Sequence, residues 1–176
     1  MREEIMVNHN DKSPTHSLND KWDMYYHLPT DPNWDLRSYK PIMKGINKME
    51  DTLAIIRAIN INVIKGCMLF LMRDGITPRW EDPRNRNGGC FSYKIHNKNV
   101  ANCWNQLFKY VTGESFSTIE NVNKHINGIT VSPKRNFCII KVWMDTDKYQ
   151  DSSVFNDIMD EQSSYECLFK KHEPED

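Results

Sequence analysis

The chain of 176 residues and 20.8 kDa has the length of one ordinary domain, with no room for a second domain and a linker. Its 39% hydrophobic and 11% aromatic residues are enough to bury a core, which excludes disorder for the middle of the chain. A formal net charge of -1 excludes the general positive field of a sequence-blind nucleic-acid binder, so any nucleic-acid contact is expected to be a local site.

The sequence carries none of the common signatures of export, metal binding or catalysis. No window approaches the roughly 20 apolar residues that cross a bilayer, and the N-terminus has no apolar stretch of a signal peptide. The five cysteines are odd in number, scattered and never spaced C-x-x-C, which fits neither a disulfide framework nor a zinc knuckle. We therefore expect a cytoplasmic protein, not bound to a membrane, without a metal, a cofactor or catalytic residues.

Strand patterns recur along the chain after a polar start. Residues 1–15 are polar and lack periodicity, which predicts a disordered N-terminal tail followed by one domain over residues 16–176. Alternating apolar residues predict strands at residues 21–28, 66–72, 90–96, 136–144 and 165–170. Clusters of Gly, Asn, Asp and Pro separate these segments, which indicates hairpin turns and an antiparallel sheet.

Helical periodicity occurs between the strands. It is clearest over residues 99–111, with Gly113 as the stop, and further helices are predicted over residues 48–59 and 152–162. The order of elements favours the α+β class, with a curved antiparallel β-sheet and three helices packed on its convex face. The other face of the sheet is then free for a ligand.

Two of the five tryptophans, Trp34 and Trp80, lie in polar loops. An exposed indole on a loop is suited to stack on a planar or cationic ligand. The alternative is that each loop folds back and packs its indole against the rim of the core. Trp22, Trp104 and Trp143 instead repeat with their apolar neighbours, as core residues do.

A family resemblance appears around Trp80. Residues 74–82 read DGITPRWED and residues 85–89 read NRNGG. This combination resembles the eukaryotic translation initiation factor 4E family, the mRNA cap-binding proteins. The similarity extends to HSLNDKW at residues 16–22, MED at 49–51, TGESF at 112–116 and the Gly-to-Trp spacing of residues 128–143, and covers about residues 16–172. It implies a non-enzymatic, monomeric protein that binds the 7-methylguanosine cap of mRNA and supports translation initiation.

The resemblance implies a base pocket. Trp34 and Trp80 would sandwich the 7-methylguanine, whose positive charge adds cation–π attraction to stacking. Glu81 would accept hydrogen bonds from guanine N1–H and N2–H, and Trp143 would lie near the methyl group. Tyr39 competes with Trp34 as the first stacking partner, although we expect Tyr39 to be an ordinary strand residue. A core role is the alternative for Trp143.

For the cap phosphates the chain departs from the family pattern. Cys90 follows the two glycines, where a basic residue is usual, and Ile139 occupies the second of two basic positions before Trp143. The remaining candidates for phosphate contact are Lys134 and Lys141, with Arg84, Arg86 and Arg135 as further ones. Each lost charge pair should cost about 1 kcal/mol and lower the salt sensitivity of binding.

The resemblance also implies that a helix of an initiation-scaffold protein docks on the helical face. The corresponding positions are His16, Met49, Leu53, Asn105, Gln106 and Lys109. Leu53 stands where the family has Trp. This difference indicates a divergent member that binds its partner more weakly or binds a different partner. Two alternatives remain: a repressor or decoy that sequesters capped mRNA, and an interaction module that kept the fold and lost cap binding.

Overall fold

The computed structural model describes residues 15–158 and 166–172. The strands are β1 (Ser17–His27), β2 (Lys40–Lys48), β3 (Met68–Arg73), β4 (Gly89–His96), β5 (Ile126–Pro133), β6 (Phe137–Met144) and β7 (Glu166–Lys171). The helices are α1 (Met49–Ala58), α2 (Ile61–Gly66) and α3 (Val100–Thr112), with short 3-10 helices at Leu36–Ser38, Val122–His125 and Ser152–Val154. The tail predicted over residues 1–15 lies, apart from Thr15, outside the described residues.

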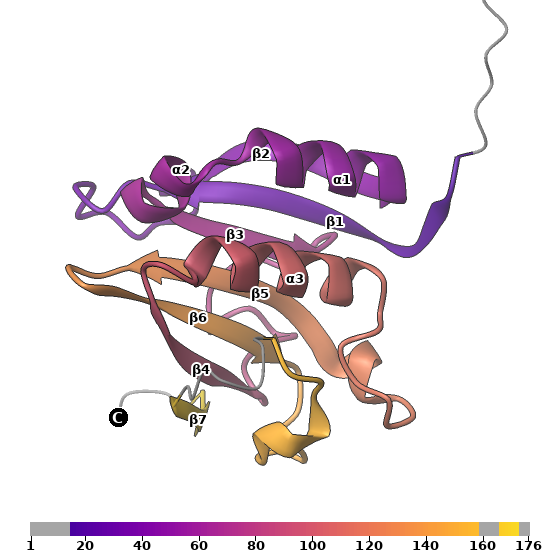
Figure 1. The fold of residues 1–176 in the computed structure, drawn as a ribbon. Coiled ribbons are helices and arrows are strands. Elements are labelled where there is room, and N and C mark those ends of the chain that lie inside the picture. The colour runs from indigo at the N-terminus through magenta and orange to yellow at the C-terminus, as the bar shows by residue number, and fades with distance from the viewer. Residues whose placement is uncertain (1–14, 159–165, 173–176) are drawn as a thin grey trace, which may run out of the picture.

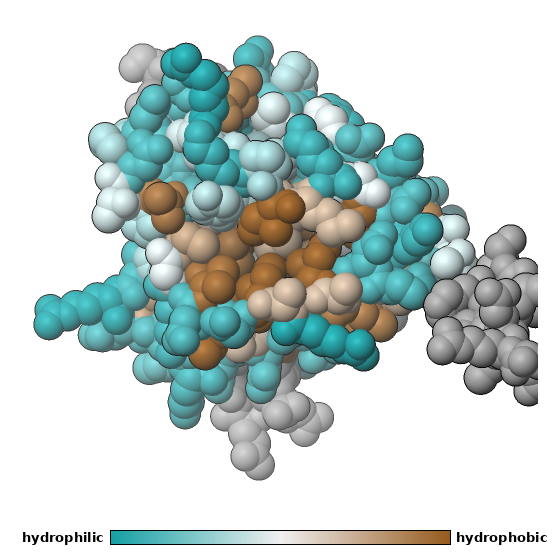
Figure 2. Space-filling view, turned by 90° about the horizontal axis from the view of Figure 1, so that it is seen from above, coloured by the Kyte–Doolittle hydropathy of each residue, from teal (hydrophilic) through white to brown (hydrophobic). Residues whose placement is uncertain are grey.

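The strands form one open antiparallel sheet in the order β2-β1-β3-β5-β6-β4-β7. The three α-helices lie on one side of it (Figure 1). This arrangement confirms the predicted α+β class. Figure 2 shows the side of the molecule that carries α1 and α2, where apolar side chains gather at the centre of a polar surround.

Alternation along the central strands assigns each side chain to one face of the sheet. Leu69 and Leu71 of β3 belong to the core beneath the helices, while Met72 of the same strand packs in a smaller cluster with Trp143. Trp22 and Trp104 are buried in the main core, as predicted. The face opposite the helices is therefore left for a second set of side chains.

The helix predicted over residues 99–111 is confirmed as α3, and that over 48–59 as α1. The apolar side chains of α3 pack in the core, and Gly113 follows the helix as its C-cap. The segment at residues 66–72 differs from the prediction, because Gly66 ends the short helix α2 and the strand begins only at Met68. Asn60 caps α2, since its side-chain oxygen accepts from the backbone N–H groups of Asn62 and Val63.

The helix predicted over residues 152–162 is wrong for its described part, and residues 159–162 lie outside the described residues. Ser152–Val154 form only a 3-10 turn. The Asn156 backbone N–H donates to the Phe116 carbonyl at 2.8 Å, and the Phe155 ring stacks on Phe116 with centroids 4.4 Å apart. These tertiary contacts hold the segment in an irregular course despite its helical periodicity.

The sequence prediction also missed β2 and β5, and its hairpin interpretation is wrong for residues 73–89. Strands β3 and β4, which this segment joins, are separated in the sheet by β5 and β6. The segment is instead a long connection that crosses from one half of the sheet to the other. Its course brings Trp80 and Glu81 to the face opposite the helices.

Candidate functional site

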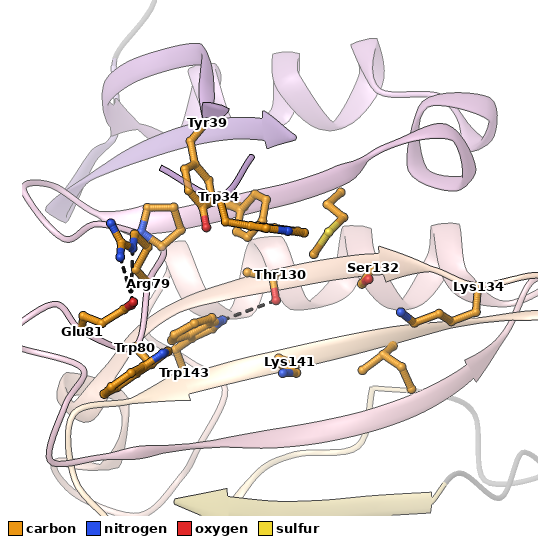
Figure 3. Close-up of a pocket in the computed structure, with 14 residues that line it drawn as sticks. Trp34, Tyr39, Arg79, Trp80, Glu81, Thr130, Ser132, Lys134, Lys141 and Trp143 are labelled. Atoms are coloured by element: carbon orange, nitrogen blue, oxygen red, sulfur yellow. Dashed lines mark hydrogen bonds and ion pairs between the residues drawn. The ribbon is translucent and has the colours of Figure 1, made fainter. Parts of the chain in front are cut away.

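A pocket of about 540 Å³ opens on the face of the sheet that the helices leave free (Figure 3). Its lining comprises Trp34, Tyr39, Met68, Phe70, Pro78, Arg79, Trp80, Glu81, Thr130, Ser132, Lys134, Ile139, Lys141 and Trp143. These residues come from the loops after β1, β3 and β5 and from strands β3, β5 and β6. The pocket combines five aromatic side chains with one carboxylate and three cations.

Trp34 lies in the β1–β2 loop and is 49% exposed. One face of its indole rests on the buried imidazole of His27, with ring centroids 4.0 Å apart and planes 4° from parallel. Nε2 of His27 donates to the carbonyl oxygen of Asn33 at 2.9 Å, which ties the imidazole to the loop that carries Trp34. The indole is therefore supported from behind while its pocket side stays open. The sequence pattern gave no indication of this role for His27.

Tyr39, the competing aromatic residue, is buried and lies immediately before β2 rather than within a strand. Its ring packs edge-on against Phe70, with centroids 5.2 Å apart. It also meets Trp34 edge-on, at a centroid separation of 6.3 Å. Burial raises the pKa of the Tyr39 hydroxyl above its ordinary value. Tyr39 thus forms part of the wall beside Trp34.

The loop of Trp80 and Glu81 is fixed by hydrogen bonds within itself. The Asp82 carboxylate accepts from the backbone N–H and the hydroxyl of Thr77, both at 2.8 Å. The Asn85 amide, which is fully buried, donates to the carbonyl oxygens of Thr77 and Arg79 at 3.0 and 2.7 Å. Burial of Asp82 opposes its ionisation, but the N–H donors and the hydroxyl outweigh it and lower the pKa of that carboxyl. Such a loop presents Trp80 and Glu81 in a defined orientation.

Glu81 forms a two-point ion pair with Arg79. Nη2 of Arg79 lies 2.7 Å from Oε1, and Nε lies 3.3 Å from Oε2. These hydrogen bonds are the chief reason that the pKa of Glu81 falls below its ordinary value. Glu81 is therefore ionised at neutral pH, and both of its oxygens are engaged.

Trp80 and Trp143 lie close together below Trp34 in the view of Figure 3. Trp80 is half-buried and packs on the small cluster of Met72, Ile76, Cys90 and Trp143. Trp143 is 8% exposed, and its Nε1–H donates to the Thr130 hydroxyl at 3.3 Å. It lines the pocket together with Lys141 and Ile139 of the same strand, which agrees with the predicted period-two alternation.

The basic candidates are not all brought to the pocket. Lys134 and Lys141 line it and are exposed, with Lys134 at the end away from Glu81 (Figure 3). Arg84 instead lines a separate polar hollow, where it donates to the Asp74 carbonyl at 3.1 Å. Arg86 is outside the lining and donates to the Glu81 carbonyl at 3.3 Å.

Cys90, which replaces a basic residue, does not line the pocket either. It is buried beside His172, with Sγ 3.4 Å from Nε2 of that imidazole. Burial raises the pKa of the Cys90 thiol to about 12, so it stays neutral near pH 7. Position 90 therefore supplies no charge to the pocket.

The residues expected to meet a partner helix lie away from the pocket, on and beside α1 and α3. The imidazole of His16 pairs with Glu50 of α1 at 2.8 Å, and Met49 and Leu53 are partly exposed on the same helix. On α3, Gln106 and Lys109 are exposed and Asn105 is partly buried. The neighbouring apolar side chains that are only partly buried are Ile56, Ile59 and Ile61.

Among residues 15–158 and 166–172, no cluster of three or more His, Cys, Asp or Glu side chains is arranged to hold a metal ion. No helix in this part of the chain is long and apolar enough to cross a membrane.

An open antiparallel sheet that carries helices on one face and an aromatic, partly charged pocket on the other defines a class of ligand-binding α+β protein. The sequence profile of the family Eukaryotic initiation factor 4E matches residues 17–174, and the chain belongs to this family. Family members are translation initiation factors.

Individual relatives are similar at modest identity. The eukaryotic translation initiation factor 4E homolog of Acanthamoeba polyphaga mimivirus is 33% identical over 115 residues, which are 57% of this chain and 42% of that protein. The factor 4E of Eremothecium gossypii is 28% identical over 151 residues, which are 81% of this chain and 68% of that protein. The chain thus spans less than half of the first relative and about two thirds of the second.

Solved structures share the fold. Ascaris suum eIF4E-3, crystallised with an m7G cap, superposes with a TM-score of 0.67 at 21% identity over 76% of each chain. Schistosome eIF4E, crystallised with m7GpppG and 4E-BP, superposes with a TM-score of 0.64 at 22% identity over 77% of this chain and 75% of the other.

Proposed function

We propose that this chain binds the 7-methylguanosine cap of mRNA in the pocket described above and acts in translation initiation. The observation that carries the proposal is that Trp34 and Trp80, which are 46 residues apart in the sequence, line one open pocket with Glu81 beside them. Family membership and the cap-bound relatives agree with this reading.

The chemistry of the pocket suits a cationic purine. Methylation at N7 gives the base a positive charge, and stacking on indole faces combines dispersion with cation–π attraction, together worth about 2–4 kcal/mol. The ionised Glu81 offers two acceptor oxygens to the N1–H and N2–H donors of guanine, a pair that adenine lacks. Trp143 closes the pocket next to Trp80.

The lysines extend the site toward the phosphates. Lys134 and Lys141 would contact the phosphate chain, assisted by the hydroxyl groups of Thr130 and Ser132, which line the same wall. With Cys90 and Ile139 neutral, the pocket holds fewer cations than the family pattern offers. We therefore assign most of the affinity to the base and a smaller share to the phosphates.

The proposal extends to a protein partner and a location. A scaffold-protein or repressor helix would dock over α1 and α3, near the partly exposed Met49, Leu53 and Ile56, as the relative crystallised with 4E-BP suggests. The site of action would be the cytoplasm, where capped mRNA is translated.

Fluorescence titration tests the base-binding proposal. Adding 7-methylguanosine diphosphate should quench tryptophan emission to saturation, and unmethylated guanosine diphosphate should bind at least about tenfold more weakly because it lacks the cation. Trp34→Ala should remove most of the binding. Leu36→Ala is the matched control, since Leu36 is 55% exposed on the same loop and does not line the pocket. Equal affinity for the two nucleotides would refute the proposal.

A further inference from the structure

The guanidinium of Arg79 is hydrogen-bonded to the carboxylate of Glu81, the group that recognises the base in the proposed function. Its Nε and Nη2 each approach one oxygen of Glu81, at 3.3 and 2.7 Å. The pair lies at the pocket wall, with side chains that are 31% and 38% exposed. The contact is thus open to the pocket rather than locked in the interior.

The edge that Arg79 presents has the donor pattern of guanine. An arginine directs two parallel N–H groups at a carboxylate, in a planar fork. Guanine directs N1–H and N2–H in the same way from its Watson–Crick edge. The position that bridges both oxygens of a carboxylate holds one such fork, and Arg79 fills it, so the guanine edge competes with Arg79 for this position.

We propose that Arg79 is an internal competitor for guanine: in the free protein it holds Glu81, and base binding requires the guanidinium to turn away. This inference rests on the proposed function, because it assumes that Glu81 reads the base. Arg79 then sets the affinity for guanine without contacting it in the bound state.

The surroundings allow such a displacement. Among the described residues, the side chain of Arg79 hydrogen-bonds only to Glu81, and it is 31% exposed. Asp35, on the loop of Trp34, also favours its positive charge and offers an anionic direction in which it can turn. Only the side chain of Arg79 would turn. Its backbone stays in place, because the Asn85 amide donates to the Arg79 carbonyl at 2.7 Å.

The ion pair between Arg79 and Glu81 also has an effect that favours base binding and acts against the competition. It restricts the side chain of Glu81, which lowers the entropy lost when the base binds. An exposed pair of this kind is weak, so its release costs the ligand little. We expect net competition, visible as a modest gain in affinity when the guanidinium is removed.

The test compares Arg79→Met with the wild-type protein. Methionine replaces the apolar stem of the arginine side chain and removes the fork. Affinity for 7-methylguanosine diphosphate, measured by calorimetry, should rise about two- to fivefold, the range set by exposed ion pairs. Arg57→Met, at the exposed end of α1, makes the same change in net charge away from the pocket and should leave the affinity unchanged.

A second ligand separates competition from simple charge repulsion. 7-Methyladenosine diphosphate carries the same positive base without the donor pair, so Arg79→Met should leave its affinity unchanged. A gain of equal size for both nucleotides would show repulsion between cations and overturn the inference. In a Glu81→Gln background the effect of Arg79→Met on the guanine ligand should vanish, and a persisting gain would likewise overturn it.

Failure of the inference is distinct from failure of the proposed function. If the wild-type protein does not bind 7-methylguanosine diphosphate, the proposed function fails, and the inference fails with it. If the wild-type protein binds and Arg79→Met binds equally or more weakly, the cap-binding proposal stands and only the competition is refuted.

Discussion

The imidazole of His27 lies parallel to the indole of Trp34, with ring centroids 4.0 Å apart. His27 is the last residue of β1 and is fully buried, whereas Trp34 is half exposed on the following loop. A residue of the sheet thus holds the loop indole in place. This relationship explains how an exposed tryptophan has a defined orientation before any ligand arrives.

His27→Val should weaken the binding of 7-methylguanosine diphosphate about two- to tenfold, because aromatic stacking contributes about 0.5–1.5 kcal/mol. His27→Phe keeps a ring behind the indole and should lose less, although the hydrogen bond to Asn33 is gone. Fluorescence titration measures both affinities, and thermal unfolding checks that each variant folds. The same loss in both variants would show that stacking does not position Trp34.

Lys134→Ala and Lys141→Ala should each reduce affinity for 7-methylguanosine triphosphate about two- to fivefold at low salt and flatten its salt dependence, since exposed charge pairs are screened by ions. Titrations at several salt concentrations provide the measurement. Arg84→Ala serves as control because Arg84 lines a different hollow, and its salt dependence should match that of the wild type. A flattened slope for Arg84→Ala would contradict the assignment of the phosphate end.

Gly88→Ala should destabilise the fold by about 2 kcal/mol or more, because overpacking a closed site forces the backbone to move. A Cβ atom at this position would lie 1.8 Å from the Met144 carbonyl oxygen. Gly66→Ala is the matched control at the end of α2, where an added Cβ meets nothing within 4 Å. Urea unfolding should show Gly66→Ala equal to or more stable than the wild type, and Gly88→Ala clearly less stable.

Glu114→Gln should lower the free energy of unfolding by about 1–3 kcal/mol at pH 7, because it weakens a largely buried ion pair with Arg73. Oε1 of Glu114 lies 2.7 Å from Nη1 of Arg73, and Oε2 accepts from Asn19 at 3.0 Å. Burial opposes ionisation of Glu114, but these donors outweigh it and lower the pKa of the carboxyl below its ordinary 4.5.

The sign of the pH effect follows from that lowered pKa. The unfolded chain binds a proton at this carboxyl more readily than the folded one, so the contribution is fully present above pH 4.5 and is lost as pH falls through the folded-state value. The difference in stability between wild type and Glu114→Gln should therefore shrink when urea unfolding is repeated at pH 3.5. A difference that stays constant would assign the destabilisation to packing.

Much of the fold was readable from local patterns. Strand β4 and helix α3 carry strong alternation and strong 3.6-residue periodicity, and both formed as predicted. Strand β2 was not predicted, because most of its side chains are exposed and it contains Pro41 and Gly45. Local rules assign these two residue types to loops. The segment after Asp151 was predicted as a helix from its periodicity, but contacts with Phe116 hold it in an irregular conformation.

Local sequence specifies much of the loop of Trp80 and Glu81, because most of the hydrogen bonds that fold it join residues 77–85. Asn127 of β5 completes it from a distance, since its amide donates to the Arg84 carbonyl and to the Asn85 side chain. The residues that meet this loop in the pocket come from distant segments and are set by the packing of the sheet. Tertiary packing brought Trp34 and Lys134 to one pocket, left Arg84 outside it and placed His27 behind an indole. The positions of these side chains depend on strand order and on rotamers, which are set by packing between segments far apart in the chain. The local spacing of residues therefore does not predict them.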